Sequence, residues 1–159
     1  MTEDANLDFW EKLFDSDCKI YNKNPPMTAD EINAELKFCE EVLAGKTFPP
    51  SYINFKKFCN IDEMENGERY FQFFSLKEIC EGITAYEFPV YMNGAISFAM
   101  NGGGVHYVFD TREKSPGGEY NIYAVSSGNL GWDKDQAFFL GNSFVEVITA
   151  KTNIEELMF

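Results

Sequence analysis

Two apolar runs joined by glycines occupy residues 95–110, which read AISFAMNGGGVHYVFD. Residues 95–100 and 105–110 alternate or stay apolar, a pattern typical of strands with buried faces. Glycines at 102–104 supply the positive φ angles that a tight connection between antiparallel strands requires. The stretch therefore predicts a β-hairpin in the second half of the chain.

Helical patterns dominate the first half. Residues 7–14 form a short amphipathic pattern, and residues 28–31 (Thr-Ala-Asp-Glu) are a capping box that starts a helix expected to stop at Gly45. Pro49-Pro50 opens a third helix, because proline is tolerated in a first turn. Its residues Tyr52, Phe55 and Cys59 recur at helical spacing and are predicted to face the core.

The remaining segments are assigned from caps and aromatic runs. We predict an acidic loop over 62–68, a strand over 69–74, a short helix from Ser75 to Cys80, a turn at 115–118, a strand over 121–125, a short helix capped by Asp133 through Phe138, and a last helix capped by Ser143.

Helices therefore lead, a mostly antiparallel sheet follows, and helices close the chain. Segregated elements of this kind predict an α+β fold rather than a βαβ-wound one. The length of 159 residues fits a single domain over 1–159. Sixteen Phe, eight Tyr and two Trp can build a dense core without disulfides or metal.

The chain is acidic, with 26 Asp and Glu against 13 Lys and Arg and a net charge of −13. This charge disfavours nucleic acid and anionic membrane surfaces, which attract Lys and Arg. A basic protein partner is favoured, since complementary fields accelerate encounter. Solubility alone is the other explanation of the charge.

The cysteines indicate a reduced compartment. Cys18, Cys39, Cys59 and Cys80 lie about twenty residues apart, which matches no zinc-ligand spacing. Three of them follow bulky apolar residues in helical patterns and are expected to be small buried hydrophobes. The first six residues lack the features of a signal peptide. We therefore expect a cytoplasmic protein with reduced thiols.

No catalytic centre is legible. His106 is the only histidine, and alternation places it opposite Val105, Tyr107 and Phe109, which predicts a surface or hydrogen-bonded packing residue rather than a catalyst. GxSxG and HExxH patterns are absent from the sequence, and the glycines at 102–104 open a strand rather than a phosphate loop. The acidic run over 62–68 lacks the order of a calcium loop. We predict no cofactor and no metal, although paired carboxylates leave a hydrolase as an alternative.

Several segments resemble the SUKH superfamily, which includes the fungal Smi/Knr cell-wall-assembly regulators and many bacterial proteins. The segment FPPSYINF at 48–55 is similar to its "LPxdYxxFL" helix, and FSLKEI at 74–79 to the step that follows. The glycine-then-strand segment at 101–110 resembles a further element, as do three closing segments, at 122–125, 128–132 and 140–146. The resemblance runs in order over about 29–148.

This resemblance implies an α+β fold with a curved antiparallel sheet and flanking helices, and no catalytic residues. Bacterial members are mostly immunity proteins that block a delivered toxin, often a nuclease. Fungal members act as signalling or scaffold proteins and usually carry added disordered regions. We therefore predict an immunity protein, with an adaptor of the same fold as the alternative.

The predicted contact surface for a basic toxin domain is the set of carboxylates in the acidic run and in the segment after Trp132. These residues are Asp62, Glu63, Glu65, Glu68, Asp133 and Asp135.

Overall fold

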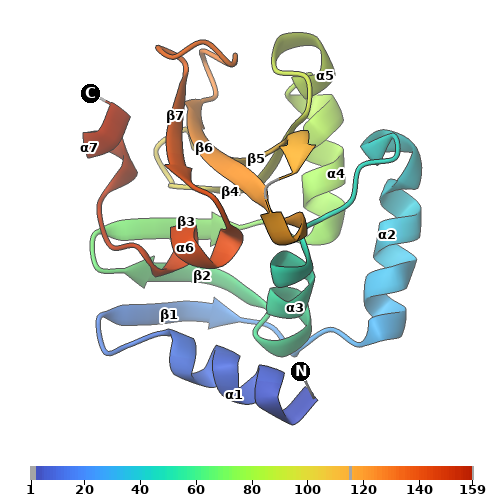
Figure 1. Ribbon diagram of the computed structural model, residues 1–159, viewed down its shortest axis with the longest axis vertical. Helices are drawn as coiled ribbons and strands as arrows, with labels where there is room; N and C mark the ends of the chain where they lie inside the picture. The colour runs from blue at the N-terminus through green and yellow to red at the C-terminus, as the bar shows by residue number, and fades with distance from the viewer. Residues whose placement is uncertain (1–2, 115, 159) are drawn as a thin grey trace.

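A computed structural model describes residues 3–114 and 116–158, and in it seven strands form one antiparallel sheet in the order β1-β2-β3-β4-β5-β6-β7 (Figure 1). Each strand pairs with the next strand along the chain, the commonest relation between sequential strands. This arrangement confirms the predicted α+β class. The strands are β1 Cys18–Lys23, β2 Ile61–Asn66, β3 Arg69–Phe73, β4 Ala95–Met100, β5 Val105–Lys114, β6 Tyr120–Ser126 and β7 Ala137–Gly141.

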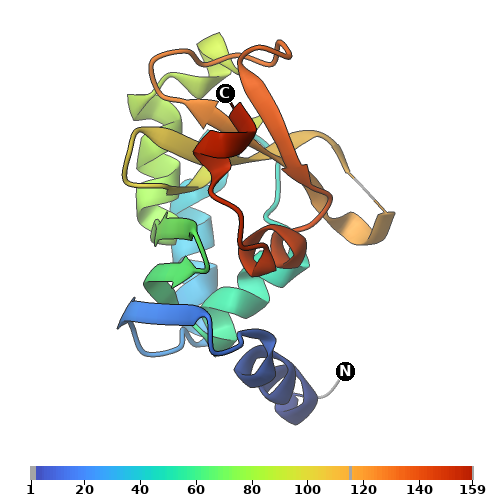
Figure 2. The same ribbon diagram turned by 90° about the vertical axis from the view of Figure 1, so that its left-hand side faces the viewer.

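Helices flank a curved sheet. In Figure 2 the sheet bends between β1 at the bottom and β7, which stands upright, and α6 lies in the bend. Among the described residues, every helix is too short or too polar to cross a bilayer. The helices are α1 Glu3–Leu13, α2 Ala29–Leu43, α3 Pro50–Phe58, α4 Leu76–Ala85, α5 Phe88–Tyr91, α6 Phe144–Thr149 and α7 Ile154–Met158, with a 3-10 turn η1 at Pro116–Gly118.

Both predicted capping boxes are confirmed. At the start of α2 the Glu31 N–H donates to Thr28 Oγ1 at 3.2 Å, and the Thr28 N–H donates to Glu31 Oε1 at 3.3 Å. At the start of α4 the Glu78 N–H donates to Ser75 Oγ at 3.1 Å, with the reciprocal bond at 2.9 Å. These bonds satisfy backbone donors that a helix start leaves unpaired, so the boundaries follow from local sequence.

The core is centred on the aromatic ring of Phe144 in α6. This ring is fully buried and lies within 5.4 Å, centroid to centroid, of the rings of Tyr52, Phe55 and Phe98. Tyr52 and Phe55 come from α3 and Phe98 from β4, so one side chain joins two helices to the sheet. Edge-to-face and tilted aromatic pairs of this kind add to the stabilisation that burial gives.

One expectation about the cysteines is wrong. Cys39 of α2 and Cys80 of α4 form a disulfide and are therefore not reduced thiols. Cys18 and Cys59 are free. Burial of Cys39, Cys59 and Cys80 is confirmed. The disulfide arises because the two helices pack side by side, a relation that sequence spacing does not reveal.

Two segments predicted as a loop and as a helix instead form or lead into strands, and a further strand was not predicted. The acidic run over 62–68 is mostly strand β2 and not a loop, with the turn at Gly67. The helix predicted from Asp133 is a single turn that leads into β7. Strand β1 was not predicted, since it carries no alternating buried pattern. Ser115 of the predicted turn and Met1 and Thr2 of the N-terminal segment lie outside the described residues.

Candidate partner-binding surface

Strand β2 separates the predicted carboxylates onto two faces of the sheet. Met64 is completely buried and points into the core, so its neighbours Glu63 and Glu65 point to the opposite face. Both glutamates are half-buried. Asp62 lies two positions before Met64, so its side chain points to the same side of the sheet as Met64, the side that the helices cover.

Two tyrosines and a glutamine surround Glu63 and Glu65 on the neighbouring strands. Tyr21 of β1 donates its hydroxyl to Glu65 Oε2 at 2.7 Å, and Tyr70 of β3 donates to Glu63 Oε2. Gln72 of β3 lies directly opposite Glu63 in the register. We call these five residues (Tyr21, Glu63, Glu65, Tyr70 and Gln72) the tyrosine–glutamate face.

Hydrogen bonding and burial raise the pKa of both phenols. The bond to Glu65 raises the pKa of Tyr21 above its usual value. Burial, followed by the bond to Glu63, raises the pKa of Tyr70. Each phenol thus remains a neutral donor that orients a carboxylate, and the carboxylate keeps its other acceptor positions for a partner.

Glu68 lies at the β2–β3 turn, at one end of this face. Its backbone N–H donates to the Lys151 carbonyl at 2.8 Å, which fixes the turn against the segment after α6. The Lys151 ammonium is itself paired with Asp15 and with Asp17, the latter at 2.7 Å. The exposed Glu68 carboxylate thus extends the acidic surface toward the N-terminal segment.

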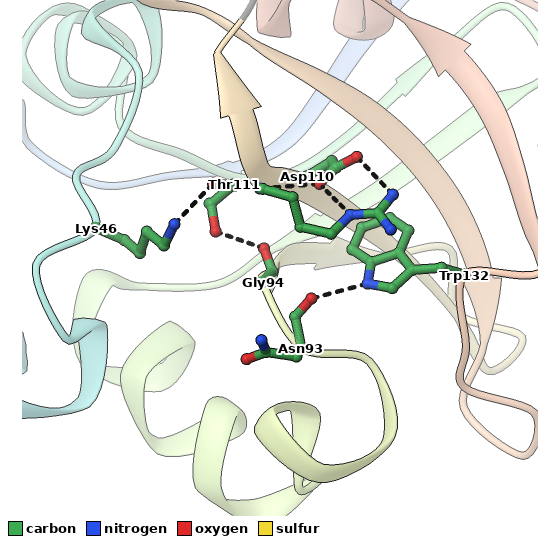
Figure 3. Close-up of polar contacts among 7 residues, drawn as sticks. Lys46, Asn93, Gly94, Asp110, Thr111 and Trp132 are labelled. Carbon is green, nitrogen blue, oxygen red and sulfur yellow. Dashed lines mark hydrogen bonds and ion pairs between the residues drawn. The ribbon is translucent and has the colours of Figure 1, made fainter.

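Asp133 and Asp135 lie on the loop between β6 and β7, which a cluster around Trp132 holds in place. The Trp132 Nε1–H donates to the Asn93 carbonyl at 2.8 Å, and the Arg112 guanidinium lies 3.8 Å from the Trp132 ring centroid (Figure 3). Arg112 is paired with Asp110 through two bonds of 2.9 and 3.0 Å. The cation that stacks on Trp132 is therefore already neutralised, and both loop aspartates are exposed.

The structure does not bring all the predicted residues together. Strand β2 lies in the lower half of the molecule, while the β6–β7 loop is at the top (Figure 1). Strands β3, β4 and β5 intervene in the sheet order. Glu63, Glu65 and Glu68 form one surface, Asp133 and Asp135 form another, and Asp62 faces a cavity on the helix-covered side.

Lys56 of α3 lines this cavity, which opens between α2 and the start of β2. Its burial was not predicted from the sequence. Its side chain is 1% exposed, and its ammonium donates to the Phe74 carbonyl at 2.9 Å. Burial lowers the pKa of Lys56 to about 8, although Asp62 and Glu35 partly oppose the shift. Position 56 belongs to the apolar stripe of α3, and this placement could have revealed a buried lysine.

Of the two predicted roles for His106, a surface residue or a hydrogen-bonded packing residue, the structure shows the second. His106 is completely buried, its Nδ1 lies 2.7 Å from Ser97 Oγ, and the rings of Tyr86 and Phe88 meet it edge-on. Burial lowers the pKa of His106 to about 4, so the ring is neutral near pH 7. No group of His, Cys, Asp and Glu within 3–114 and 116–158 could hold a metal ion.

These features define an α+β protein with a curved antiparallel sheet and an ordered acidic face. The model of the SMI1 / KNR4 family (SUKH-1) matches residues 28–150, so the chain belongs to this family. The match confirms the resemblance that the motifs indicated. A search of curated proteins found no match.

Proposed function

We propose that this chain is an immunity protein that binds a bacterial toxin domain and covers its active site. Bacterial members of the SMI1 / KNR4 family (SUKH-1) are mostly non-catalytic immunity proteins, which supports this role. The proposed toxin is a nuclease acting in the cytoplasm, where the immunity protein would meet it. The observation that carries the proposal is the tyrosine–glutamate face.

The chemistry of this face fits a basic partner. A nuclease active site is lined by cations because it holds phosphates, so carboxylates accelerate and orient the encounter. Tyrosine is enriched among the residues that dominate binding energy at interfaces. Tyr21 is 54% exposed and hydrogen-bonded to Glu65, so it offers an apolar ring beside a charge. Glu68 extends this surface, and we propose that Asp62, Asp133 and Asp135 add to the long-range attraction.

Co-expression tests this proposal. A toxic domain encoded beside the gene for this chain should stop growth when expressed alone, and the chain should restore growth. The double variant E63K/E65K should lose protection, because it replaces two acceptors by two cations that repel a basic surface.

The matched control is D133K/D135K, which changes the net charge by the same amount on the other surface. It should retain most of the protection. The proposal fails if the chain never restores growth, and the surface assignment fails if both variants behave alike. Recovery of a non-toxic cellular partner would instead indicate an adaptor.

A further inference from the structure

A cavity of about 300 Å³ opens between α2, the start of β2 and the segment that precedes α2. Its walls are held by backbone bonds. The Asn24 N–H donates to the Asn60 carbonyl at 2.9 Å, and the Met27 N–H donates to the Lys56 carbonyl at 3.1 Å. The Asn60 amide also donates to the Pro25 carbonyl at 2.8 Å. The cavity is therefore preformed, which reduces the ordering cost of binding.

Three carboxylates line this cavity, namely those of Glu31 and Glu35 on α2 and Asp62 on β2. One oxygen of Glu31 already accepts the Thr28 N–H in the capping box. The Glu35 Oε2 atom is buried and has no hydrogen-bond partner among the described residues. A buried acceptor without a donor is costly, and a small rotation of the half-buried Glu35 side chain toward the cavity would let this oxygen accept a hydrogen bond from a bound donor.

The only cation that lines the cavity among the described residues is the ammonium of Lys56. Its bond to the Phe74 carbonyl holds it at the back of the site. Three carboxylates against one ammonium leave the cavity with a net negative charge. This net negative lining favours the entry of a second cation.

We propose that this cavity binds a guanidinium group, supplied by an arginine side chain of the protein partner. A guanidinium presents five N–H donors in a plane, so it can bond carboxylates on two different elements at once. It is also more weakly hydrated than an ammonium, which favours entry into a half-enclosed site. The claim that a partner protein supplies the arginine rests on the proposed function. The claim that the cavity prefers a guanidinium group is independent of it.

Blocked arginine amide (N-acetyl-arginine-N-methylamide) is the probe. We expect it to shift the amide signals of Glu35, Asn60 and Asp62 in ¹⁵N-labelled full-length chain and to saturate in the millimolar range, as about 4 kcal/mol of binding gives. E35Q/D62N should weaken binding at least tenfold. E155Q/E156Q, with the same charge change at exposed positions of α7 outside both proposed sites, should leave it unaltered.

The pH dependence gives a second readout. The charged groups that face Lys56 are Glu35 from α2, Asp62 from β2 and Glu78 from α4. A bound guanidinium adds a positive charge beside Lys56 and favours loss of its proton, so binding should tighten as pH rises from 7 to 9, through the pKa of about 8. The gain is up to about tenfold. K56M should bind at least as tightly as wild type and should show no such gain.

The outcomes separate the two proposals. Shifts scattered over the surface, or shifts unchanged in E35Q/D62N, would overturn the cavity assignment while leaving toxin neutralisation untouched. An increase in affinity between pH 7 and pH 9 that persists in K56M would also contradict the cavity assignment, because the proton lost on binding would then come from another group. Arginine binding without neutralisation of any toxin would sustain the cavity and reject the proposed function. Equal affinity for blocked lysine amide would contradict the preference for guanidinium.

Discussion

Replacing Phe144 with alanine is expected to lower the free energy of unfolding by about 3–5 kcal/mol. The ring is fully buried among Tyr52, Phe55, Phe98 and other aromatic side chains. Its removal leaves a cavity where α3, α6 and β4 meet, and rigid rings on three elements fill such a space poorly. Urea unfolding followed by circular dichroism measures the change as a lower midpoint.

Phe139→Ala is the matched control for this prediction. Phe139 lies on β7, close in sequence to α6, but it is 53% exposed and its ring contacts Tyr123 at 5.7 Å. Its loss should cost no more than about 1 kcal/mol, the scale of one exposed aromatic pair. Equal losses of unfolding free energy in the Phe144 and Phe139 variants would show that Phe144 is not the centre of the core.

Reduction of the Cys39–Cys80 disulfide is expected to destabilise the protein by about 4 kcal/mol. The bond closes a loop with a sequence separation of 41, and the loss of chain entropy in the unfolded state scales with the logarithm of loop length. For a protein of this size such a change lowers Tm by about 8–16 °C. Calorimetry of oxidised protein and of protein prepared under reductant gives the difference directly.

The variant C18S/C59A controls for the free thiols. It retains Cys39 and Cys80, so the difference in Tm between its oxidised and reduced forms should persist. Coincident melting curves for oxidised and reduced wild type, or peptide mapping that places the bond elsewhere, would contradict the prediction. Because the cytoplasm is reducing, the proposed location implies that the protein works there with the weaker, reduced connection between α2 and α4.

Local sequence signals account for the elements that were predicted correctly. The capping boxes at Thr28 and Ser75 fix two helix starts, and residues 95–110 form the expected hairpin. Strand β2 was missed because its buried apolar residues Ile61 and Met64 are three positions apart, a spacing that matches neither face of a regular strand.

The end of the chain shows why a helix was predicted where β7 forms. The Gln136 and Ala137 N–H groups both donate to the Asp133 carbonyl, so one turn does form after Asp133. The chain then pairs with β6 instead of continuing the helix, and this tertiary pairing outweighs the local preference.

The site was predictable only in part. Charge alone led to the proposal of Glu63, Glu65 and Glu68 as contact residues, but their tyrosine partners depend on cross-strand register, and the strand that carries Tyr21 has no sequence signal. Long-range packing also separates Asp133 from this surface. The buried position of Lys56, in contrast, follows from the spacing of the apolar residues in α3.

The association rate constant between this chain and the toxin domain encoded beside its gene tests the central proposal most directly. Stopped-flow fluorescence over a range of salt concentrations should give a rate that falls steeply with salt for wild type and is about tenfold lower for E63K/E65K at low salt, with a shallower salt dependence. An unchanged rate and an unchanged salt dependence in that variant would contradict an anionic face that recognises a cationic partner.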